Sequence, residues 1–97
     1  MPGYIYILYC SNDTYYTGST RNIERRIAEH QAGEGANYTK KHLPVDLVYY
    51  EYYTSIKDAF NREKQIQGWS RKKKEALITG ELNELPILSK KIFRKKL

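Results

Sequence analysis

The sequence predicts an α+β domain in which a small three-stranded antiparallel sheet is flanked by about three helices. Three segments are rich in the aromatic and β-branched residues that favour strands, and three others repeat apolar residues with a helical period. Taken along the chain, these segments give the order β-β-α-β-α-α. A chain of 97 residues is short enough for a single domain. We expect that domain to cover residues 1–80, followed by a basic C-terminal tail over 81–97 that is partly docked or disordered.

The first two strands are predicted by a tyrosine-rich segment and the turn that follows it. Residues 4–10 read YIYILYC, and both faces of this strand are apolar because side chains alternate along a strand. Residues 11–14 are turn formers, and residues 15–18 read YYTG. The short connection predicts an antiparallel hairpin. The third strand is predicted at residues 45–53, which read VDLVYYEYY.

Each predicted helix follows a residue whose side chain can cap a helix N-terminus. The first helix is expected over about 22–32, the second begins after residue 55, and the third covers 71–79 and ends at Gly80. The capping residues are Asn22, Ser55 and Ser70. The segment between the first helix and the third strand, 33–44, is predicted to be a loop.

The first helix places two polar side chains close to its apolar stripe. Ile23 and Ile27 define the stripe, and His30 falls almost in line with them. Arg26 lies on the edge of the stripe, whereas Arg25 points nearly the opposite way. We therefore expect Arg25 to be solvated and Arg26 to lean over the sheet. Taken singly, such an arginine is a surface charge and such a histidine is a half-buried structural residue.

Glu63 is an unusual residue because it falls in the middle of an apolar stripe on the second helix. The apolar members of this stripe are Ile56, Ala59, Phe60 and Ile66. A carboxylate in this position must be paired, neutralised or bound to a metal. The simplest interpretation is a wet stripe edge, or a salt bridge to one of three cations: Arg62, Lys64 or Arg26. The alternative is Mg²⁺, which keeps most of its waters and takes few protein ligands.

The positive charge is concentrated in the last third of the chain. Residues 1–54 carry a net charge of −1 and residues 55–97 a net charge of +7, within a total of +6. This asymmetry suits a polyanion such as nucleic acid, and a solubilising surface is the equally simple alternative. The basic residues expected to contact phosphates lie on the third helix and in the loop before the third strand: Arg71, Lys72, Lys73, Lys74, Lys40 and Lys41.

Several classes of protein are disfavoured by what the sequence lacks. No run of eighteen apolar residues predicts a transmembrane helix, and no basic segment followed by an apolar run predicts a secretory signal. The single cysteine, Cys10, excludes an internal disulfide and a zinc site of several cysteines. We expect a reduced, cytoplasmic setting without a membrane partner.

Five separated residues form one pattern: Tyr6, Tyr16, Arg26, His30 and Glu63. Together they resemble the motif of the GIY-YIG nuclease family. The segment YIYIL stands where the family has G-I-Y, and the segment YTG stands where it has Y-I-G, with Thr17 in place of isoleucine. An arginine lies eight residues after Gly18, and a histidine lies four residues after that arginine. A glutamate lies on the second helix. The matching positions are Tyr6, Tyr16, Arg26, His30 and Glu63. The resemblance covers roughly residues 2–78.

This resemblance implies one-metal phosphodiester hydrolysis. It assigns Glu63 to Mg²⁺ or Mn²⁺ and Arg26 to the scissile phosphate. It makes Tyr6 the candidate general base, and Tyr16 would orient water or phosphate. Which of the two tyrosines is the base stays open. His30 would relay protons or position Arg26. Because an ordinary tyrosine has a pKa of about 10, a nearby cation must lower the pKa of the base.

The function expected from the resemblance is a DNA endonuclease that recognises the structure of its substrate rather than its sequence. The chain would act as a monomer, and a protein partner would supply further DNA affinity. Two alternatives stay open: a catalytically silent module of the same fold that binds DNA or RNA, and a basic protein associated with the ribosome or RNA.

Overall fold

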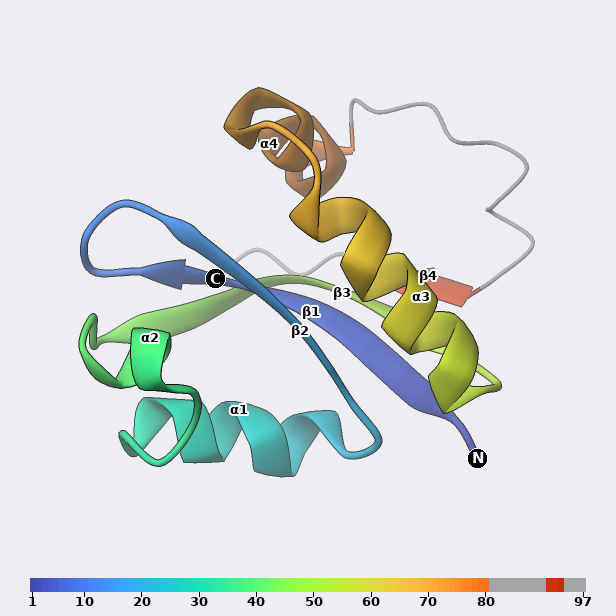
Figure 1. Ribbon diagram of the computed structural model, residues 1–97, viewed down its shortest axis with the longest axis horizontal. Helices are drawn as coiled ribbons and strands as arrows, with labels where there is room; N and C mark the ends of the chain where they lie inside the picture. The colour runs from blue at the N-terminus through green and yellow to red at the C-terminus, as the bar shows by residue number, and fades with distance from the viewer. Residues whose placement is uncertain (81–90, 94–97) are drawn as a thin grey trace.

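The structure is a computed structural model that describes residues 1–80 and 91–93. Four strands form one antiparallel sheet in the order β2-β1-β3-β4 (Figure 1). Their bounds are β1 Gly3–Cys10, β2 Tyr15–Thr20, β3 Val45–Tyr53 and β4 Lys91–Phe93. The predicted three-stranded sheet is confirmed, and the short strand β4 extends it beside β3. The rest of the predicted tail, 81–90 and 94–97, lies outside the described residues.

Within the described residues, four helices accompany the sheet: α1 Ile23–Gln31, α2 Asn37–Lys40, α3 Ile56–Gln67 and α4 Arg71–Thr79. The three predicted helices are confirmed, with caps as expected. Asn22 Oδ1 accepts from the amide of Arg25, and Ser70 Oγ accepts from that of Lys73. Gly80 ends α4 with a φ of 83°, a left-handed conformation that glycine adopts without strain. The segment predicted as a loop contains the additional short helix α2.

The two faces of β1 are buried against different helices, as its alternating pattern predicts. Ile5 and Ile7 pack with Ala59 and Ile66 of α3 on one face. On the other face, Leu8 belongs to a cluster against which Ile23 and Ile27 of α1 pack. Figure 1 shows α1 along one side of the sheet and α3 with α4 along the other. Strand β2 is therefore an edge strand with helices on both of its faces.

The buried stripe of α3 differs from the expectation at two positions. Phe60 was expected in the core, but it is 48% exposed, and Arg62 is buried instead. Arg62 lies three residues after Ala59 and four before Ile66, so it shares their face of the helix. The buried carboxylate of Glu51 compensates the charge of Arg62. Nε of Arg62 donates to Oε1 of Glu51 at 3.0 Å, and Nη2 donates to Oε2 at 3.1 Å.

Glu51 is the centre of a buried polar cluster in which both carboxylate oxygens are satisfied. The hydroxyl of Tyr49 donates to Oε2 at 2.5 Å, and the hydroxyl of Tyr53 donates to Oε1 at 2.6 Å. Together with Arg62, these tyrosines tie β3 to α3. Burial raises the pKa of Tyr49, and the neighbouring carboxylate adds to the rise. The cluster is consequently a structural element that fixes α3, and with it Glu63, against the sheet.

Each helix of the described part of the chain is too short or too polar to cross a membrane.

Candidate active site

Tyr6 lies in β1 with its ring across the neighbouring strand β2. The ring is buried, with 1% of the residue exposed, and its hydroxyl lies over Gly18. A Cβ added at Gly18 would overlap that hydroxyl and come within 2.6 Å of Cζ of Tyr6. The glycine of the YTG segment is therefore required for space, since any side chain would displace the Tyr6 ring.

His30 of α1 meets the Tyr6 hydroxyl and is completely buried. Nε2 of His30 lies 2.8 Å from the Tyr6 oxygen, and Nδ1 lies 2.8 Å from Oγ1 of Thr39. Thr39 has a single hydroxyl proton, which it donates to the carbonyl oxygen of Ala36 at 3.0 Å. Oγ1 must then accept a proton from Nδ1, which leaves Nε2 as an acceptor. Tyr6 therefore donates its hydroxyl proton to a neutral His30.

A second glycine makes room for His30. A Cβ at Gly35 would overlap Nδ1 of the His30 ring and come within 2.8 Å of Cγ. Gly35 lies between α1 and α2 and Thr39 lies in α2, so both belong to the segment 33–44. This segment, expected to be a loop, thus encloses the histidine and fixes its tautomer.

The surroundings hold both members of the Tyr6–His30 pair in their neutral forms. Burial raises the pKa of Tyr6 to about 12, and the interaction with the Arg26 guanidinium opposes this rise. Burial lowers the pKa of His30 to about 4, and the charge of Arg26 lowers it further. The expected lowering of the Tyr6 pKa by Arg26 is thus outweighed by burial, because the ring lies inside the domain.

Arg26 and Arg25 differ as predicted. The Arg26 side chain is 33% exposed and interacts with the Tyr6 hydroxyl, while the Arg25 side chain is 77% exposed. Both contact Glu29, with Arg26 Nη1 at 3.0 Å from Oε1 and Arg25 Nε at 3.4 Å from Oε2. Glu29 therefore anchors the guanidinium that lies beside Tyr6.

Tyr16 of β2 is half-buried on the α1 side of the sheet. Its ring lies 5.4 Å from the His30 ring, and 6.4 Å from the nearly parallel ring of Tyr38 in α2. Burial raises the pKa of Tyr16, the charge of Arg26 opposes the rise, and Glu63 adds to it. Tyr16 thus lies within electrostatic reach of both charged candidates.

Glu63 of α3 approaches the site from the opposite face of β2. Ser19 Oγ donates to its Oε1 at 2.5 Å, and Gln67 Nε2 donates to its Oε2 at 2.7 Å. The carboxylate adds to the raised pKa of Tyr6 and of Tyr16, although burial is the main cause for each. Among the ion pairs of the described residues, none includes Glu63.

Of the alternatives left open for Glu63, the salt bridge to Arg62, Lys64 or Arg26 does not form in the described part of the chain. Arg62 binds Glu51, Lys64 Nζ lies 4.9 Å from the centre of the Phe60 ring, and Arg26 contacts Glu29. All three cations are engaged elsewhere. The Glu63 carboxylate is held instead by two neutral donors, Ser19 and Gln67.

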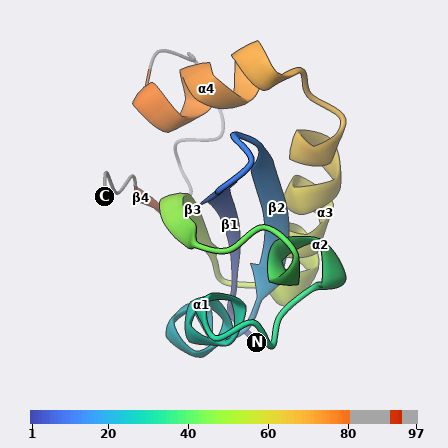
Figure 2. The same cartoon turned by 90° about the vertical axis from the view of Figure 1, so that its left-hand side faces the viewer.

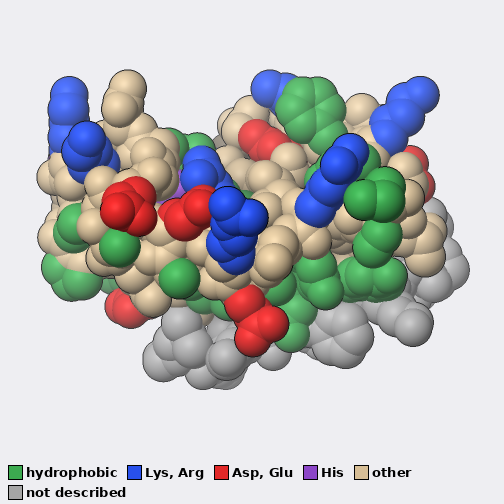
Figure 3. All heavy atoms as spheres, turned by 90° about the horizontal axis from the view of Figure 1, so that it is seen from below, with side chains coloured by type: hydrophobic (Ala, Val, Ile, Leu, Met, Phe, Trp, Pro, Cys, Tyr) green, Lys and Arg blue, Asp and Glu red, His purple; other side chains and the backbone are tan. Residues whose placement is uncertain are grey.

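The candidate site straddles the edge strand β2. Tyr6, Tyr16, Arg26 and His30 meet on the α1 side, and Glu63 lies across the strand on the α3 side. Seen from below, the molecular surface dips between two raised parts, and lysine or arginine side chains stand on both (Figure 3). The roles assigned to these residues stay predictions.

The six expected phosphate contacts are dispersed, and one of them has internal partners. Arg71 donates to the backbone oxygen of Asp13 and, at 2.9 Å, to its Oδ1, and Nε bonds Glu75 at 3.1 Å. This arginine joins α4 to the β1–β2 turn. The others are Lys72, Lys73, Lys74, Lys40 and Lys41. All are exposed except the half-buried Lys74, and Lys73 lies 4.3 Å from the centre of the Trp69 ring.

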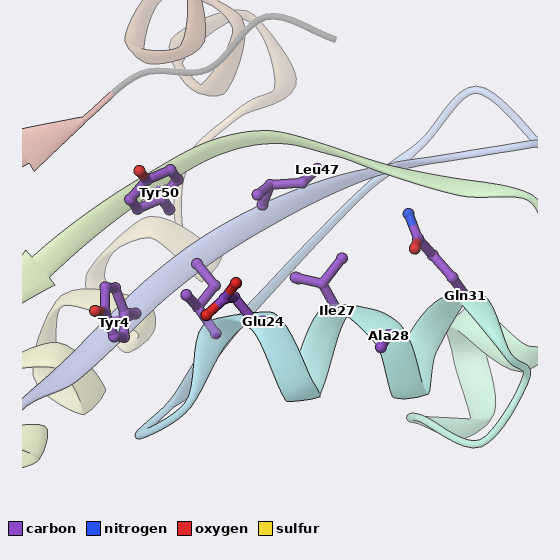
Figure 4. Close-up of a pocket in the computed structure, with 8 residues that line it drawn as sticks. Tyr4, Glu24, Ile27, Ala28, Gln31, Leu47 and Tyr50 are labelled. Atoms are coloured by element: carbon purple, nitrogen blue, oxygen red, sulfur yellow. The ribbon is translucent and has the colours of Figure 1, made fainter.

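A pocket of about 480 Å³ between α1 and the sheet lies apart from this site. Figure 4 shows Ile27 of α1 and Leu47 of β3 on opposite sides of it, with Tyr4 and Tyr50 toward one end. None of the five candidate residues lines it.

Sequence reasoning missed the residues that hold the candidates in place. These are Ser19, Gln67, Thr39, Gly35 and Glu29. The signal for Gln67 was available, since it lies four residues after Glu63 on the same helix. The sequence did not connect Thr39 or Gly35 with His30, because only the folded segment brings them to it.

The comparisons with known proteins agree with the fold and extend over most of the chain. The family model described as the GIY-YIG catalytic domain matches residues 2–76. A UPF0213 protein of Natronomonas pharaonis is 51% identical over 80% of this chain and 92% of its own length. A UPF0213 protein of Staphylococcus haemolyticus is 48% identical over 77% of this chain and 92% of its own length.

Two solved structures are also similar. The solution NMR structure of a UPF0213 protein from Bacillus halodurans has a TM-score of 0.55 and 36% identity, and covers 88% of this chain and 90% of that one. A protein of E. faecalis, also solved by NMR, has a TM-score of 0.56 and 32% identity, and covers 82% of this chain and 85% of that one. The match of the family model over three quarters of the sequence, on a fold that carries the motif tyrosines on adjacent strands, shows that this chain belongs to the GIY-YIG domain family of the nuclease superfamily.

Proposed function

We propose that this protein is a divalent-metal-dependent endonuclease that hydrolyses phosphodiester bonds in DNA and selects the structure of its substrate rather than its sequence. The observation that carries the proposal is the Tyr6 hydroxyl, which donates to neutral His30 beside the guanidinium of Arg26. A tyrosine that only filled the core would not need a buried histidine whose tautomer is fixed by a further hydrogen bond.

The residues present fit a single hard cation. Glu63 is a half-buried carboxylate without an ion-pair partner among the described residues, and Ser19 and Gln67 hold its two oxygens in place. The described residues hold no cluster of three or more histidine, cysteine or acidic side chains. One carboxylate suits Mg²⁺ or Mn²⁺, which fills its remaining positions with water and substrate phosphate. When bound, the ion would supply Lewis-acid stabilisation of the phosphate charge.

Tyr6 can act as a base only if its own proton leaves. At neutral pH the residue is a phenol, because its pKa is raised to about 12 by burial. A water molecule that donates to the phenol oxygen can transfer a proton to it as the hydroxyl proton moves to Nε2 of His30, 2.8 Å away. Nδ1 keeps its proton, which Thr39 accepts in a hydrogen bond. His30 would thus act as the proton acceptor behind Tyr6.

Arg26 would bind the scissile phosphate. Its planar guanidinium can donate two parallel hydrogen bonds to phosphate oxygens, and the contact with Glu29 orients it. As negative charge develops on the phosphorane-like transition state, a preorganised cation stabilises it more than the ground state. Tyr16, on the same side of β2, would orient the attacking water or the phosphate.

The basic side chains away from the centre would bind phosphates of the flanking DNA. Lys72, Lys73 and Lys74 lie on α4, Lys40 is the last residue of α2, and Lys41 follows it. Such contacts fix the position of the duplex and carry no sequence information. The dispersed arrangement supports recognition of DNA shape, and affinity would fall steeply with salt.

The second candidate is a catalytically silent module that binds nucleic acid. One observation favours it, namely that neither Tyr6 nor His30 is ionised at neutral pH, so the resting site holds no activated base.

A cleavage assay separates the two candidates. Supercoiled, branched and single-stranded DNA would be incubated with the protein and Mg²⁺ or Mn²⁺, with Arg26→Ala and its neighbour Arg25→Ala as a matched pair. We expect cleavage by the wild-type protein and by Arg25→Ala, and loss of cleavage in Arg26→Ala. Binding without cleavage by any form would support the silent module. Equal cleavage by both variants would remove Arg26 from the chemistry.

A further inference from the structure

A groove runs from the candidate site along β2 toward α4. Its part next to the site has a volume of about 250 Å³, and Tyr16 and Gln67 lie in its wall. Tyr16 belongs to the candidate site, and Gln67 bonds Glu63 at 2.7 Å, so the groove begins where the site ends. Its continuation, of about 210 Å³, shares Tyr15 and Lys74 with the first part.

An aromatic ring stands on one side of this groove. Tyr38 is 40% exposed, one of the few large apolar side chains of the described residues with so much surface in solvent. Its ring is nearly parallel to that of Tyr16, with 13° between the planes, and the ring of His42 lies 4.6 Å away. The Tyr38 oxygen is bonded by Asn12 Nδ2 at 3.0 Å and lies 2.7 Å from the hydroxyl of Thr14. The ring is therefore held rigidly at the surface.

A cation stands on the other side. Lys74 is half-buried and lines both parts of the groove. Figures 1 and 2 show α4, which carries Lys74, and α2, which carries Tyr38, on either side of the β1–β2 hairpin. Lys74 forms no ion pair with another described residue, so its ammonium group is available to an anion.

We propose that this groove binds an unpaired nucleotide next to the scissile phosphate, with the base stacked on Tyr38 and the following phosphate bound by Lys74. An aromatic ring fixed beside a cation is the arrangement with which proteins bind single-stranded nucleic acid. A base inside a duplex cannot present its face to the ring, so the groove selects strands that are frayed, flapped or single. The position of this nucleotide next to the scissile phosphate rests on the proposed function. The binding of the nucleotide does not.

Binding of short oligonucleotides tests the groove without cleavage. A fluorescent single strand and the blunt duplex of the same sequence would be titrated in EDTA against the wild-type protein, Tyr38→Phe, Tyr38→Leu and Tyr38→Ala. Loss of one stacked base weakens binding by roughly tenfold or more. We expect this loss for the single strand with Tyr38→Leu and Tyr38→Ala, and affinity near wild type with Tyr38→Phe. The duplex should respond little to any of the three.

Lys74→Gln and Lys57→Gln form the matched pair for the cation. Lys57 is exposed at the start of α3 and does not line the groove. Lys74→Gln should lower the slope of log affinity against log salt by about 0.7, the value for one phosphate of a single strand, and Lys57→Gln should leave it unchanged. Thermal unfolding of each variant shows whether it is folded, and Tyr38→Leu retains apolar bulk if Tyr38→Ala unfolds.

An abasic substitution assigns the contact to one nucleotide. A single strand with an abasic site at the stacked position should bind wild type and Tyr38→Leu equally, because the ring has lost its partner. Equal losses with intact and abasic strands, or equal binding of single strand and duplex, would overturn the groove proposal. If the Tyr38 effect holds but no DNA is cut, the proposed endonuclease fails and the nucleotide site stands. If DNA is cut and Tyr38→Leu binds like wild type, the proposed endonuclease stands and the nucleotide site fails.

Discussion

The Tyr6 hydroxyl donates a hydrogen bond of 2.8 Å to Nε2 of His30, although the tyrosine comes from β1 and the histidine from α1. The direction of this bond follows from Thr39, which occupies the Nδ1 proton of the same ring. It gives the tyrosine an internal proton acceptor, which a phenol with a pKa of about 12 requires to act as a base.

Two substitutions of His30 separate proton transfer from positioning. In His30→Gln, an amide oxygen can still accept from Tyr6, but it cannot take the proton. We expect this variant to unfold within a few degrees of the wild-type protein and to cleave DNA about 100-fold more slowly, the lower range of general acid–base effects. His30→Ala should lose both stability and activity. If His30→Gln cleaves at the wild-type rate, the histidine only positions Tyr6.

The buried histidine makes stability fall in mild acid. His30 has a pKa of about 4 in the folded protein, against 6.5 for an ordinary histidine. Between these values the unfolded chain binds a proton that the folded chain excludes, so stability is complete above about pH 6.5 and declines toward pH 4. The loss is about 3 kcal/mol at most. Urea denaturation at pH 7 and 4.5 measures it, and His30→Gln should lose less stability than wild type. An identical decline in both proteins would contradict the lowered pKa of His30.

Gly18 tests whether space for the Tyr6 ring is essential. Gly18→Ala places a Cβ within 2.6 Å of Cζ of Tyr6, and we expect a loss of about 1–3 kcal/mol in the free energy of unfolding. Gly68→Ala is the control, because its Cβ would meet nothing closer than 3.6 Å and its φ of −81° suits alanine. Denaturant unfolding of both variants gives the comparison. A Gly18→Ala protein as stable as Gly68→Ala would show that the ring has room to move.

Glu63 is predicted to hold the divalent ion independently of any cleavage. Mn²⁺ broadens NMR signals of nearby amides, so titration into the wild-type protein should broaden those of Ser19 and Gln67 first, since both bond Glu63. Glu63→Gln keeps an oxygen for the Ser19 hydroxyl and should reduce this broadening at least about tenfold. Glu24→Gln, at an exposed position of α1, serves as the control. Unchanged broadening in Glu63→Gln would place the ion elsewhere.

The sequence was sufficient for strands β1 to β3, for helices α1, α3 and α4 and for the motif, since these depend on local patterns, but it predicted neither α2 nor β4. Alternation in residues 4–10 predicted a strand buried on both faces, and the helical positions of Arg25 and Arg26 predicted their different exposure. These inferences need only the geometry of one strand or one helix.

Contacts between distant segments could not be predicted. On α3, Arg62 is buried and Phe60 is exposed, the reverse of the expectation. Arg62 is buried because it pairs with Glu51, which lies on the distant strand β3. The pKa of Tyr6 likewise depends on two opposing effects, the burial of its ring, which raises it, and the nearby Arg26, which lowers it. The sequence pattern predicted that Arg26 lies near Tyr6. It did not predict that burial changes the pKa of Tyr6 more than Arg26 does.

The proposed mechanism requires that the Tyr6 hydroxyl take part in the chemistry. The most direct test compares single-turnover cleavage of DNA by the wild-type protein, Tyr6→Phe and Tyr4→Phe at saturating Mn²⁺. Tyr4 lies two residues earlier on the same face of β1 and outside the site. We predict that Tyr6→Phe lowers the rate by about 10²–10⁴, the range of general acid–base catalysis, while Tyr4→Phe stays near wild type. Cleavage by folded Tyr6→Phe at the rate of Tyr4→Phe would show that the Tyr6 hydroxyl has no part in the chemistry.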